Sequence, residues 1–385
     1  MKPIFTRRFP VALALVASLS AAILLFATTG CAGAQTTTSA ALPPAPKGFF
    51  GIGPQTGLSE RDAQYMKAGG IEVVRYPLVW SEVQATRSGG YNWDTFDGVV
   101  AEATRHGLQV LPFVVDTPRW LSLKGTKLPI DTARARKAWT QFLQAAVKRY
   151  GPGGEFWTLR APGVVQYEPA IPKPLPIRTW QIWNEANFFY FAYPASPQRY
   201  ARLLKLSTPA IKRVDPKAKV IAAGLFGSPN PRGARGMPAA QFLEAIYRIR
   251  GMKRYFDGVA LHPYAVDTES LEELVEEFHE VSVANRDRVP LYITEMGWGS
   301  QNNFKEVAFE QGVRGQVREL KGAYGYLLKN RRKLNLASVT WFSWKDIEES
   351  CSFCDSVGLF KGGDSFKPKP AWRAFISITH GRPRP

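Results

Sequence analysis

Residues 179–224 read TWQIWNEANFFYFAYPASPQRYARLLKLSTPAIKRVDPKAKVIAAG, and the order of patterns in this stretch decides the fold. An apolar run over 179–184 predicts a strand, and a second over 218–224 predicts another. The amphipathic pattern between them, from about Pro197 to Val214, predicts a helix. A helical crossover returns the chain to the same end of a sheet, so the two strands should be parallel. The stretch therefore predicts one strand–helix–strand unit.

The same alternation continues in both directions along the 385-residue chain. Apolar strands of four to eight residues separated by amphipathic helices are typical of a parallel sheet that is covered on its outside. Eight such units favour closure into a single (β/α)8 TIM barrel, an α/β fold, over an open sheet. The eight predicted strands are 49–53, 71–75, 108–115, 179–184, 218–224, 256–261, 291–294 and 337–342.

Polar and aromatic residues close several of these strands, at the end where such barrels carry their reactive groups. Arg75 follows the second predicted strand, and Asn184 and Glu185 close the fourth. His262-Pro263-Tyr264 follows the sixth strand, Glu295 follows the seventh, and Trp341 to Trp344 close the eighth. Ionisable groups at the ends of apolar strands are costly unless they have a use. The sequence therefore predicts a site around Glu185 and Glu295.

Two carboxyl groups facing each other across a pocket suit the hydrolysis of glycosides. One must hold a proton and deliver it to the leaving oxygen, and the other must be ionised in order to attack or to activate water. A cation such as Arg75, with a hydrogen bond from Tyr264, would keep one glutamate charged, and burial would raise the pKa of the other. Aromatic rings for stacking on sugars also fall at or after strand ends, at Trp80, Trp120, Trp183, Trp298, Trp341 and Trp344.

The motifs at these strand ends resemble those of a known enzyme clan. Trp183-Asn184-Glu185 is similar to the strand-four acid/base motif of clan A retaining glycoside hydrolases, and Thr294-Glu295-Met296-Gly297-Trp298 to their strand-seven nucleophile motif. His262-Pro263-Tyr264 resembles their strand-six signature. The resemblance spans roughly Gly48 to His380 and is strongest to glycoside hydrolase family 39, in its bacterial polysaccharide-hydrolase branch. Family 5 is the nearest competitor.

This resemblance implies a role for each matching residue. Glu185 would be the acid/base and Glu295 the nucleophile, and Asn184 would bind the hydroxyl next to the reacting carbon. Arg75, His262 and Tyr264 would position and ionise Glu295, and Trp344 would form the floor of the site. Ala186 departs from the pattern, since many relatives carry Pro there. No cofactor and no metal are implied.

Other interpretations of these residues remain open. Arg75 could be a structural ion-pair partner, and His262 a core histidine with satisfied hydrogen bonds. Trp341 is expected in barrel packing, whereas Trp80 and Trp120 could serve either packing or binding. A transglycosylase would use the same catalytic residues, and a non-catalytic carbohydrate-binding barrel would share the fold. Motifs of serine hydrolases, Walker-type nucleotide enzymes, Rossmann dehydrogenases and zincins are absent.

The N-terminus predicts export. Lys2, Arg7 and Arg8 precede an apolar run from Val11 to Ala27, and small residues follow. Residues 1–34 therefore predict an export signal, with cleavage near 30/31 or 34/35. Thr28-Thr29-Gly30-Cys31 resembles a lipobox, so a lipid on Cys31 or an uncleaved leader would be the route to a membrane. Residues 35–47 predict a flexible tether, and 48–385 the barrel. The expected location is secreted or associated with the cell envelope.

The chain is strongly basic, with 50 Lys and Arg against 32 Asp and Glu and a formal net charge of +18. Long-range attraction to an anionic polysaccharide would use this charge, but dispersal over solvated faces for solubility is the simpler interpretation. An exported chain without a nucleic-acid-binding motif is not expected to bind nucleic acid. The expected partner is a carbohydrate substrate, and the charge does not define the activity.

Two further features carry expectations. Cys351 and Cys354, in Cys-Ser-Phe-Cys, are predicted to form a local disulfide, because an exported compartment permits one and no second ligand pair for zinc is nearby. The stretch from Gly151 to Arg178 holds six prolines and four glycines and predicts a long irregular loop. Such loops are often functional, and this one is expected to line an extended groove for endo cleavage of a glycan.

Overall fold

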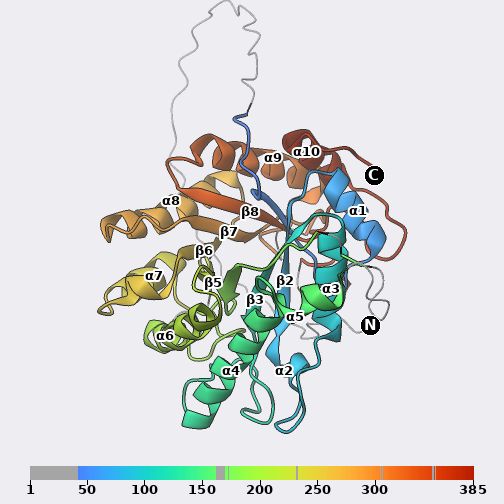
Figure 1. Cartoon of the computed structure of the whole chain (residues 1–385). Helices are drawn as coiled ribbons and strands as arrows, with labels where there is room; N and C mark the ends of the chain where they lie inside the picture. Colours follow the sequence, from blue (N-terminus) through green and yellow to red (C-terminus); the bar gives the residue numbers. More distant parts are fainter. Residues whose placement is uncertain are drawn as a thin grey trace, which may run out of the picture.

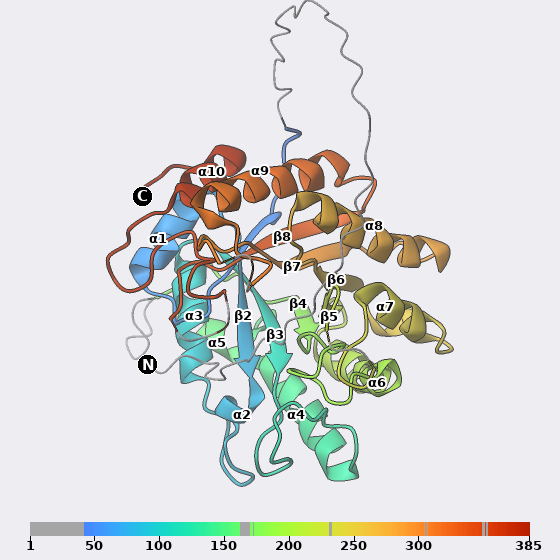
Figure 2. The ribbon, with the colours of Figure 1, turned by 180° about the vertical axis from the view of Figure 1, so that it is seen from behind.

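The computed structural model describes residues 42–161, 170–171, 173–230, 233–303, 305, 307–348, 351 and 353–385. Eight parallel strands pair in sequence order, and β8 closes onto β1. Helices surround the strands (Figures 1 and 2), so the expected single (β/α)8 barrel is confirmed. The export signal of residues 1–34 and the tether up to residue 41 lie outside the described residues. Within the described part, no helix combines the length and apolarity needed to cross a membrane.

The strands are short and almost entirely buried. They are β1 (Phe50–Gly53), β2 (Val73–Val79), β3 (Gln109–Val115), β4 (Thr179–Ile182), β5 (Lys219–Phe226), β6 (Gly258–His262), β7 (Leu291–Met296) and β8 (Leu336–Phe342). The helices are α1 (Glu60–Ala68), α2 (Trp80–Val83), α3 (Asp94–Arg105), α4 (Ala133–Tyr150), α5 (Glu155–Leu159), α6 (Pro197–Val214), α7 (Ala239–Tyr247), α8 (Thr268–Ala284), α9 (Gly312–Asn330) and α10 (Pro370–Thr379), with a 3-10 turn η2 (Met252–Tyr255).

Helix starts follow from local sequence. Ser59 caps α1 in a reciprocal capping box with Asp62, and Thr132 and Ser196 cap α4 and α6 through their hydroxyl oxygens. Each cap satisfies a backbone N–H that the first helical turn leaves without a partner. The helix that the sequence predicted from about Pro197 to Val214 is observed with these bounds, as α6.

Aromatic packing connects the helices to the strand ends that carry the predicted site. The hydroxyl of Tyr200, on α6, donates to the carbonyl of Ile182 at 2.7 Å and accepts from the amide of Ala223 at 2.5 Å. Trp139, on α4, packs edge-on against Trp183 with ring centroids 6.0 Å apart. These contacts are fully buried. They fix the positions of the ends of β4 and β5 along the barrel axis.

The long irregular stretch does not lie where it was expected. It connects α5 to the start of β4, and connections that precede strands lie at the amino-terminal end of a parallel barrel. Residues 162–169 and 172 are outside the described residues, but both ends of the stretch meet that amino-terminal side. Ile177 donates its amide to the carbonyl of Tyr150, at the end of α4. The described ends of this loop therefore lie away from the strand ends that carry the glutamates, contrary to the expectation that the loop lines the substrate groove.

Candidate active site

Glu185 is presented by an irregular turn directly after β4. Trp183 and Glu185 adopt positive φ angles of 71° and 39°, a conformation that costs free energy for residues other than glycine. The turn is held on both sides: the amide of Trp183 donates to the carbonyl of Val114 at 2.9 Å, and that of Glu185 to the carbonyl of Gly224 at 3.0 Å. The neighbouring strands therefore compensate for the strain and fix the direction of the Glu185 side chain.

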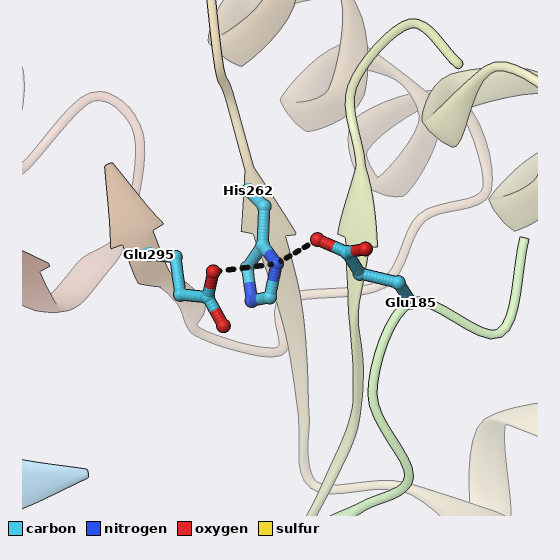
Figure 3. A group of neighbouring side chains, drawn as sticks. All are labelled: Glu185, His262 and Glu295. Atoms are coloured by element: carbon cyan, nitrogen blue, oxygen red, sulfur yellow. Dashed lines mark hydrogen bonds and ion pairs between the residues drawn. The ribbon is translucent and has the colours of Figure 1, made fainter. Parts of the chain in front are cut away.

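Glu295 and His262 reach the same place from β7 and β6. Figure 3 shows the imidazole of His262 between the two carboxyl groups. His262 Nδ1 lies 2.8 Å from Glu185 Oε1 and 3.6 Å from Glu295 Oε2. One carboxylate oxygen of each glutamate lies within 4.8 Å of the other. All three side chains are buried, so the structure brings together the two glutamates that the sequence singled out.

Arg75 connects several polar groups of the site. Its guanidinium donates to Glu295 Oε1 at 2.6 Å, to Asn184 Oδ1 at 2.7 Å and to Gln181 Oε1 at 3.1 Å. The ring of Phe113 lies 4.0 Å below the guanidinium carbon. The sequence placed Arg75 after the second strand, and this placement is wrong, because β2 runs on to Val79. The long side chain reaches the glutamates from inside the barrel wall.

Tyr264 completes the surroundings of Glu295. Its hydroxyl donates to Glu295 Oε2 at 2.9 Å, so Arg75 and Tyr264 each bind one oxygen of this carboxylate. Burial and the nearby charge of Glu295 raise the pKa of Tyr264 well above its ordinary value, which keeps it a hydrogen-bond donor. Glu295 therefore accepts one hydrogen bond on each carboxylate oxygen, and the two bonds fix the orientation of the carboxyl group.

Glu185 has the opposite environment. Burial, with the charge of Glu295 as a second cause, raises the pKa of Glu185 well above its ordinary value, and Arg75 opposes the shift only in part. Burial and the positive charge of Arg75 lower the pKa of His262, which is therefore neutral at pH 7. A neutral imidazole can either accept the proton of Glu185 in a hydrogen bond or donate one to it. Its other nitrogen lies 3.0 Å from Thr294 Oγ1.

Glu185, His262 and Glu295 also have the residue types of a metal site. Their contacts do not suit a cation. Both nitrogens of His262 already face hydrogen-bonding partners, and both oxygens of Glu295 accept hydrogen bonds from Arg75 and Tyr264. A metal ion here would lie beside the guanidinium of Arg75 and would be repelled by it. The arrangement is better suited to proton transfer than to metal binding.

The structure does not place Trp344 at the floor of the site. The indole is 1% exposed, and its Nε1 donates to Asp62 Oδ1, on α1, at 2.7 Å. Its ring packs against Phe360 and Trp372, with centroids 4.6 and 5.5 Å away. The chain turns at the end of β8, which directs this residue outward to α1 and α10. The assignment of Trp344 to substrate binding is therefore corrected to a packing role.

Aromatic rings that the sequence analysis did not single out lie beside the carboxylates instead. Phe342, the last residue of β8, and Phe353 from the following loop both pack on Tyr264, at 6.4 and 5.4 Å between centroids. Phe226 and Phe309 pack on the same ring at 5.8 and 5.6 Å. Of these, only Phe342 had a signal in the sequence, as an aromatic residue that ends a strand. Phe226 ends β5, beyond the strand predicted over 218–224, and Phe309 and Phe353 come from loops, whose placement no periodicity predicts.

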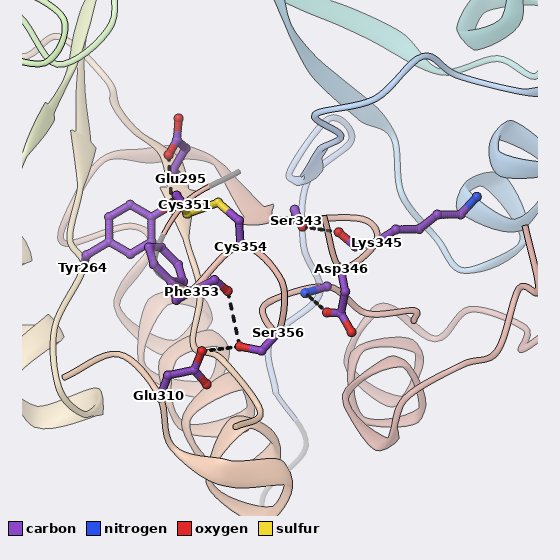
Figure 4. Close-up of a disulfide and its surroundings, with 11 residues drawn as sticks. Tyr264, Glu295, Glu310, Ser343, Lys345, Asp346, Cys351, Phe353, Cys354 and Ser356 are labelled. Carbon is purple, nitrogen blue, oxygen red and sulfur yellow. Dashed lines mark hydrogen bonds between the residues drawn. A yellow bond between two sulfur atoms is a disulfide. The ribbon is translucent and has the colours of Figure 1, made fainter. Parts of the chain in front are cut away.

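The loop after β8 carries the two cysteines. The structure joins Cys351 and Cys354 by a disulfide with a sulfur–sulfur distance of 1.99 Å, and Figure 4 shows it close to Tyr264 and Glu295. Phe353, between the cysteines in sequence, is the residue that packs on Tyr264. Glu310 accepts a hydrogen bond from Ser356 and holds the far side of the loop. The bridge therefore constrains a segment that adjoins the site.

Trp80 and Trp298 have packing roles, and Trp120 lies at the edge of the packed core. Trp80 and Trp298 are buried, and Trp298 Nε1 donates to the carbonyl of Ala265 at 2.9 Å. Trp120 is partly exposed, donates to the carbonyl of Gln84 at 3.0 Å and has Arg134 above its ring. Trp341 is fully buried, as the sequence predicted.

Solved structures with the same fold are glycoside-cleaving enzymes. A family 39 glycoside hydrolase from Bacteroides cellulosilyticus WH2 has a TM-score of 0.62 at 20% identity, over 86% of this chain and 63% of that one. A β-xylosidase from Caulobacter crescentus CB15 has a TM-score of 0.58 at 18% identity, over 88% and 69%. A GH5_18 variant from Bifidobacterium longum, in complex with Manβ1-4GlcNAc, has a TM-score of 0.58 at 14% identity, over 86% and 78%.

At identities of 20% or less, the TM-scores show a shared fold and nothing finer. The chain spans less than two thirds of the length of the Bacteroides enzyme. No family model matches the sequence, and no curated protein does. The resemblance to family 39 that the motifs indicated, with family 5 as competitor, is confirmed at the level of the fold.

Proposed function

We propose that this protein is a retaining glycosidase that cleaves a poly- or oligosaccharide outside the cytoplasm, at the cell envelope or beyond it. One observation carries the proposal: two buried glutamates have carboxylate oxygens within 4.8 Å of each other. Retaining enzymes hold these groups about 5–5.5 Å apart, whereas inverting enzymes separate them by about 6.5–9.5 Å to admit water. The location rests on the predicted leader.

The first step would use the two glutamates in different roles. The carboxylate of Glu295 attacks the anomeric carbon while the proton of Glu185 passes to the leaving oxygen, so that an ester to Glu295 forms as the glycosidic bond breaks. The raised pKa of Glu185 supports its role as the acid. Arg75 and Tyr264 each bind one oxygen of Glu295 and fix the orientation of this nucleophile.

In the second step, Glu185 takes a proton from water, which attacks the ester and releases the sugar with its original configuration. Asn184 contributes to both steps. Its Oδ1 accepts from Arg75, so the amide is oriented with Nδ2 left to donate to the hydroxyl beside the reacting carbon. Phe342, beside Tyr264, is our candidate for the ring on which the sugar stacks.

The test is azide rescue with an aryl glycoside that the wild-type protein cleaves. Glu295→Gln should remove nearly all turnover, because no nucleophile remains. Glu185→Ala should still form the glycosyl-enzyme from a substrate with an activated leaving group, which needs little protonation. Added azide should then restore turnover and give a glycosyl azide of retained configuration. An inverted product, or an active Glu295→Gln variant, would contradict the proposal; a sugar acceptor in the same assay separates hydrolysis from transglycosylation.

A further inference from the structure

A cluster of positively charged residues lies at one end of the barrel. Three consecutive connections lie at the amino-terminal end, before β6, β7 and β8, over residues 248–257, 285–290 and 331–335. We call their basic residues the basic end face. They are Arg248, Arg250, Lys253, Arg254, Arg286, Arg288, Arg331, Arg332 and Lys333, against Asp257 and Asp287 as the only acids.

Most of this face has no internal counter-charge. Among the described residues, ion pairs occupy only Arg248, with Glu244, and Lys333, with Glu276. Arg250, Arg254, Arg286, Arg288 and Arg332 are exposed and form none. Five unpaired guanidinium groups on adjacent connections repel one another, and an anionic partner would relieve that repulsion.

The two acids of the face are already engaged. Asp257 accepts from Lys212 Nζ at 2.7 Å and from the amide of Val220 at 2.8 Å. Asp287 accepts from the hydroxyl of Tyr247 at 3.1 Å. Within the described part of the chain, neither carboxylate forms an ion pair with these exposed arginines, so the face presents their positive charge to solvent.

The opposite end of the barrel shows no such excess. The eight connections that follow the strands, and that surround Glu185 and Glu295, hold 11 Lys and Arg against 12 Asp and Glu. Dispersal for solubility would not separate the charges in this way. The charge separation also gives no support to an anionic substrate at the mouth.

The N-terminal segment enters on the same side as the basic end face. Phe50 begins β1, so the residues before it arrive at the amino-terminal end of the barrel. Upstream in the sequence lie the apolar run of Val11 to Ala27 and Cys31. The C-terminal Arg382 lies at this end too, since its amide donates to the carbonyl of Ala68, which precedes β2.

We propose that the basic end face docks on an anionic phospholipid surface and directs the catalytic mouth away from it. Guanidinium groups match phosphate geometry, and each basic residue near an anionic leaflet strengthens binding about fivefold. The acidic helix α8, with its six glutamates between 269 and 280, would be repelled if the barrel lay on its side. An end-on orientation is therefore favoured.

The experiment measures co-sedimentation of the full chain with vesicles of phosphatidylcholine alone and with phosphatidylglycerol added, at low ionic strength. The difference between the two vesicles isolates the electrostatic part, because an apolar leader would insert into both. Arg250→Glu/Arg286→Glu/Arg332→Glu should reduce the phosphatidylglycerol-dependent partition coefficient about a hundredfold. Thermal melting checks the fold, and Arg→Gln versions replace any variant that melts early.

The matched control is Arg87→Glu/Arg119→Glu/Lys124→Glu, three exposed residues after β2 and β3 that change the net charge equally. It should keep most of the binding. Equal losses in both triple variants would show that net charge alone acts, and would overturn the proposal. The proposal would also be overturned if the triple variant of the basic end face lost binding to a soluble anionic polysaccharide while its binding to vesicles was unchanged. Neither result depends on glycosidase activity.

Discussion

Glu185 and Glu295 have the same side chain, and their neighbours differ. Glu295 receives a hydrogen bond on each oxygen, from Arg75 and from Tyr264. Glu185 has the imidazole of His262 and the repulsion of Glu295, in a buried position. A double displacement requires two carboxyl groups with different roles, one as the proton donor and the other as the nucleophile.

The raised pKa of Glu185 predicts two pH effects. Activity should be lost as pH rises through that pKa, because the acid is then deprotonated. The stability contribution of Glu185 is fully present below its ordinary value of 4.5 and is lost as pH rises through the raised folded-state pKa. The Glu185→Gln variant has no ionisable group at this position, so it does not lose this stability as pH rises. Its melting temperature should therefore exceed that of the wild type increasingly toward alkaline pH; a constant difference between pH 4 and pH 8 would contradict this assignment.

Gly224 allows His262 to occupy its place. A Cβ at this position would come closer than 3.0 Å to both His262 Nε2 and Thr294 Oγ1. Gly224→Ala should therefore displace His262 and lower kcat by at least about tenfold, measured with an aryl glycoside. Gly98→Ala is the control, because nothing lies within 4 Å of a Cβ there. It should leave kcat unchanged and stabilise α3 by about 0.5–1 kcal/mol.

At the scale of secondary-structure elements, two aromatic residues at the end of β8 have different roles: Phe342 is the candidate for sugar binding, and Trp344 has a packing role. Phe342 contacts Tyr264, while Trp344 reaches Asp62 on α1. Trp344→Phe should cost about 1–3 kcal/mol of unfolding free energy, because Asp62 loses a buried donor, with KM unchanged. Phe342→Ala should raise KM at least about threefold. The reverse pattern would restore Trp344 as the sugar platform.

The disulfide between Cys351 and Cys354 constrains the loop that follows β8. It encloses only a short segment, so its loss should lower the free energy of unfolding modestly. Phe353, however, would no longer be held on Tyr264. Cys351→Ser with Cys354→Ser should reduce kcat/KM more clearly than the melting temperature. Mass measurement of the protein purified without reductant checks the bridge itself, and two free thiols would refute it.

On the scale of the whole molecule, α10 packs where the last strand–helix unit meets the first strand of the barrel. It packs on α9 and lies beside α1 (Figure 1). Trp372 lies directly over Gly69, the residue after α1, where a Cβ could not fit. The hydroxyl of Thr379 donates to the carbonyl of Gly69 at 2.6 Å. The described chain therefore ends beside its own first helix.

Removal of residues 370–385 should abolish cooperative melting, because it exposes the buried faces of α1, α9 and β1 that Trp372 and Phe375 cover. Calorimetry provides the measurement. Truncation after Pro383 is the control, since the carbonyl that accepts from Trp372 Nε1 is then kept. A shortened chain that still melts cooperatively would show that α10 is dispensable.

The sequence alone determined the number and order of strands, the (β/α)8 class and the two glutamates, because periodicity and short motifs are local properties of the chain. It did not determine the direction of side chains at strand ends. Arg75 lies inside β2, Trp344 points outward, and Phe342 packs on Tyr264 beside the glutamates. Strand length and register depend on pairing with neighbours that are distant in sequence, and a shift of one residue reverses the face on which a side chain lies. Only the closed barrel decides that choice.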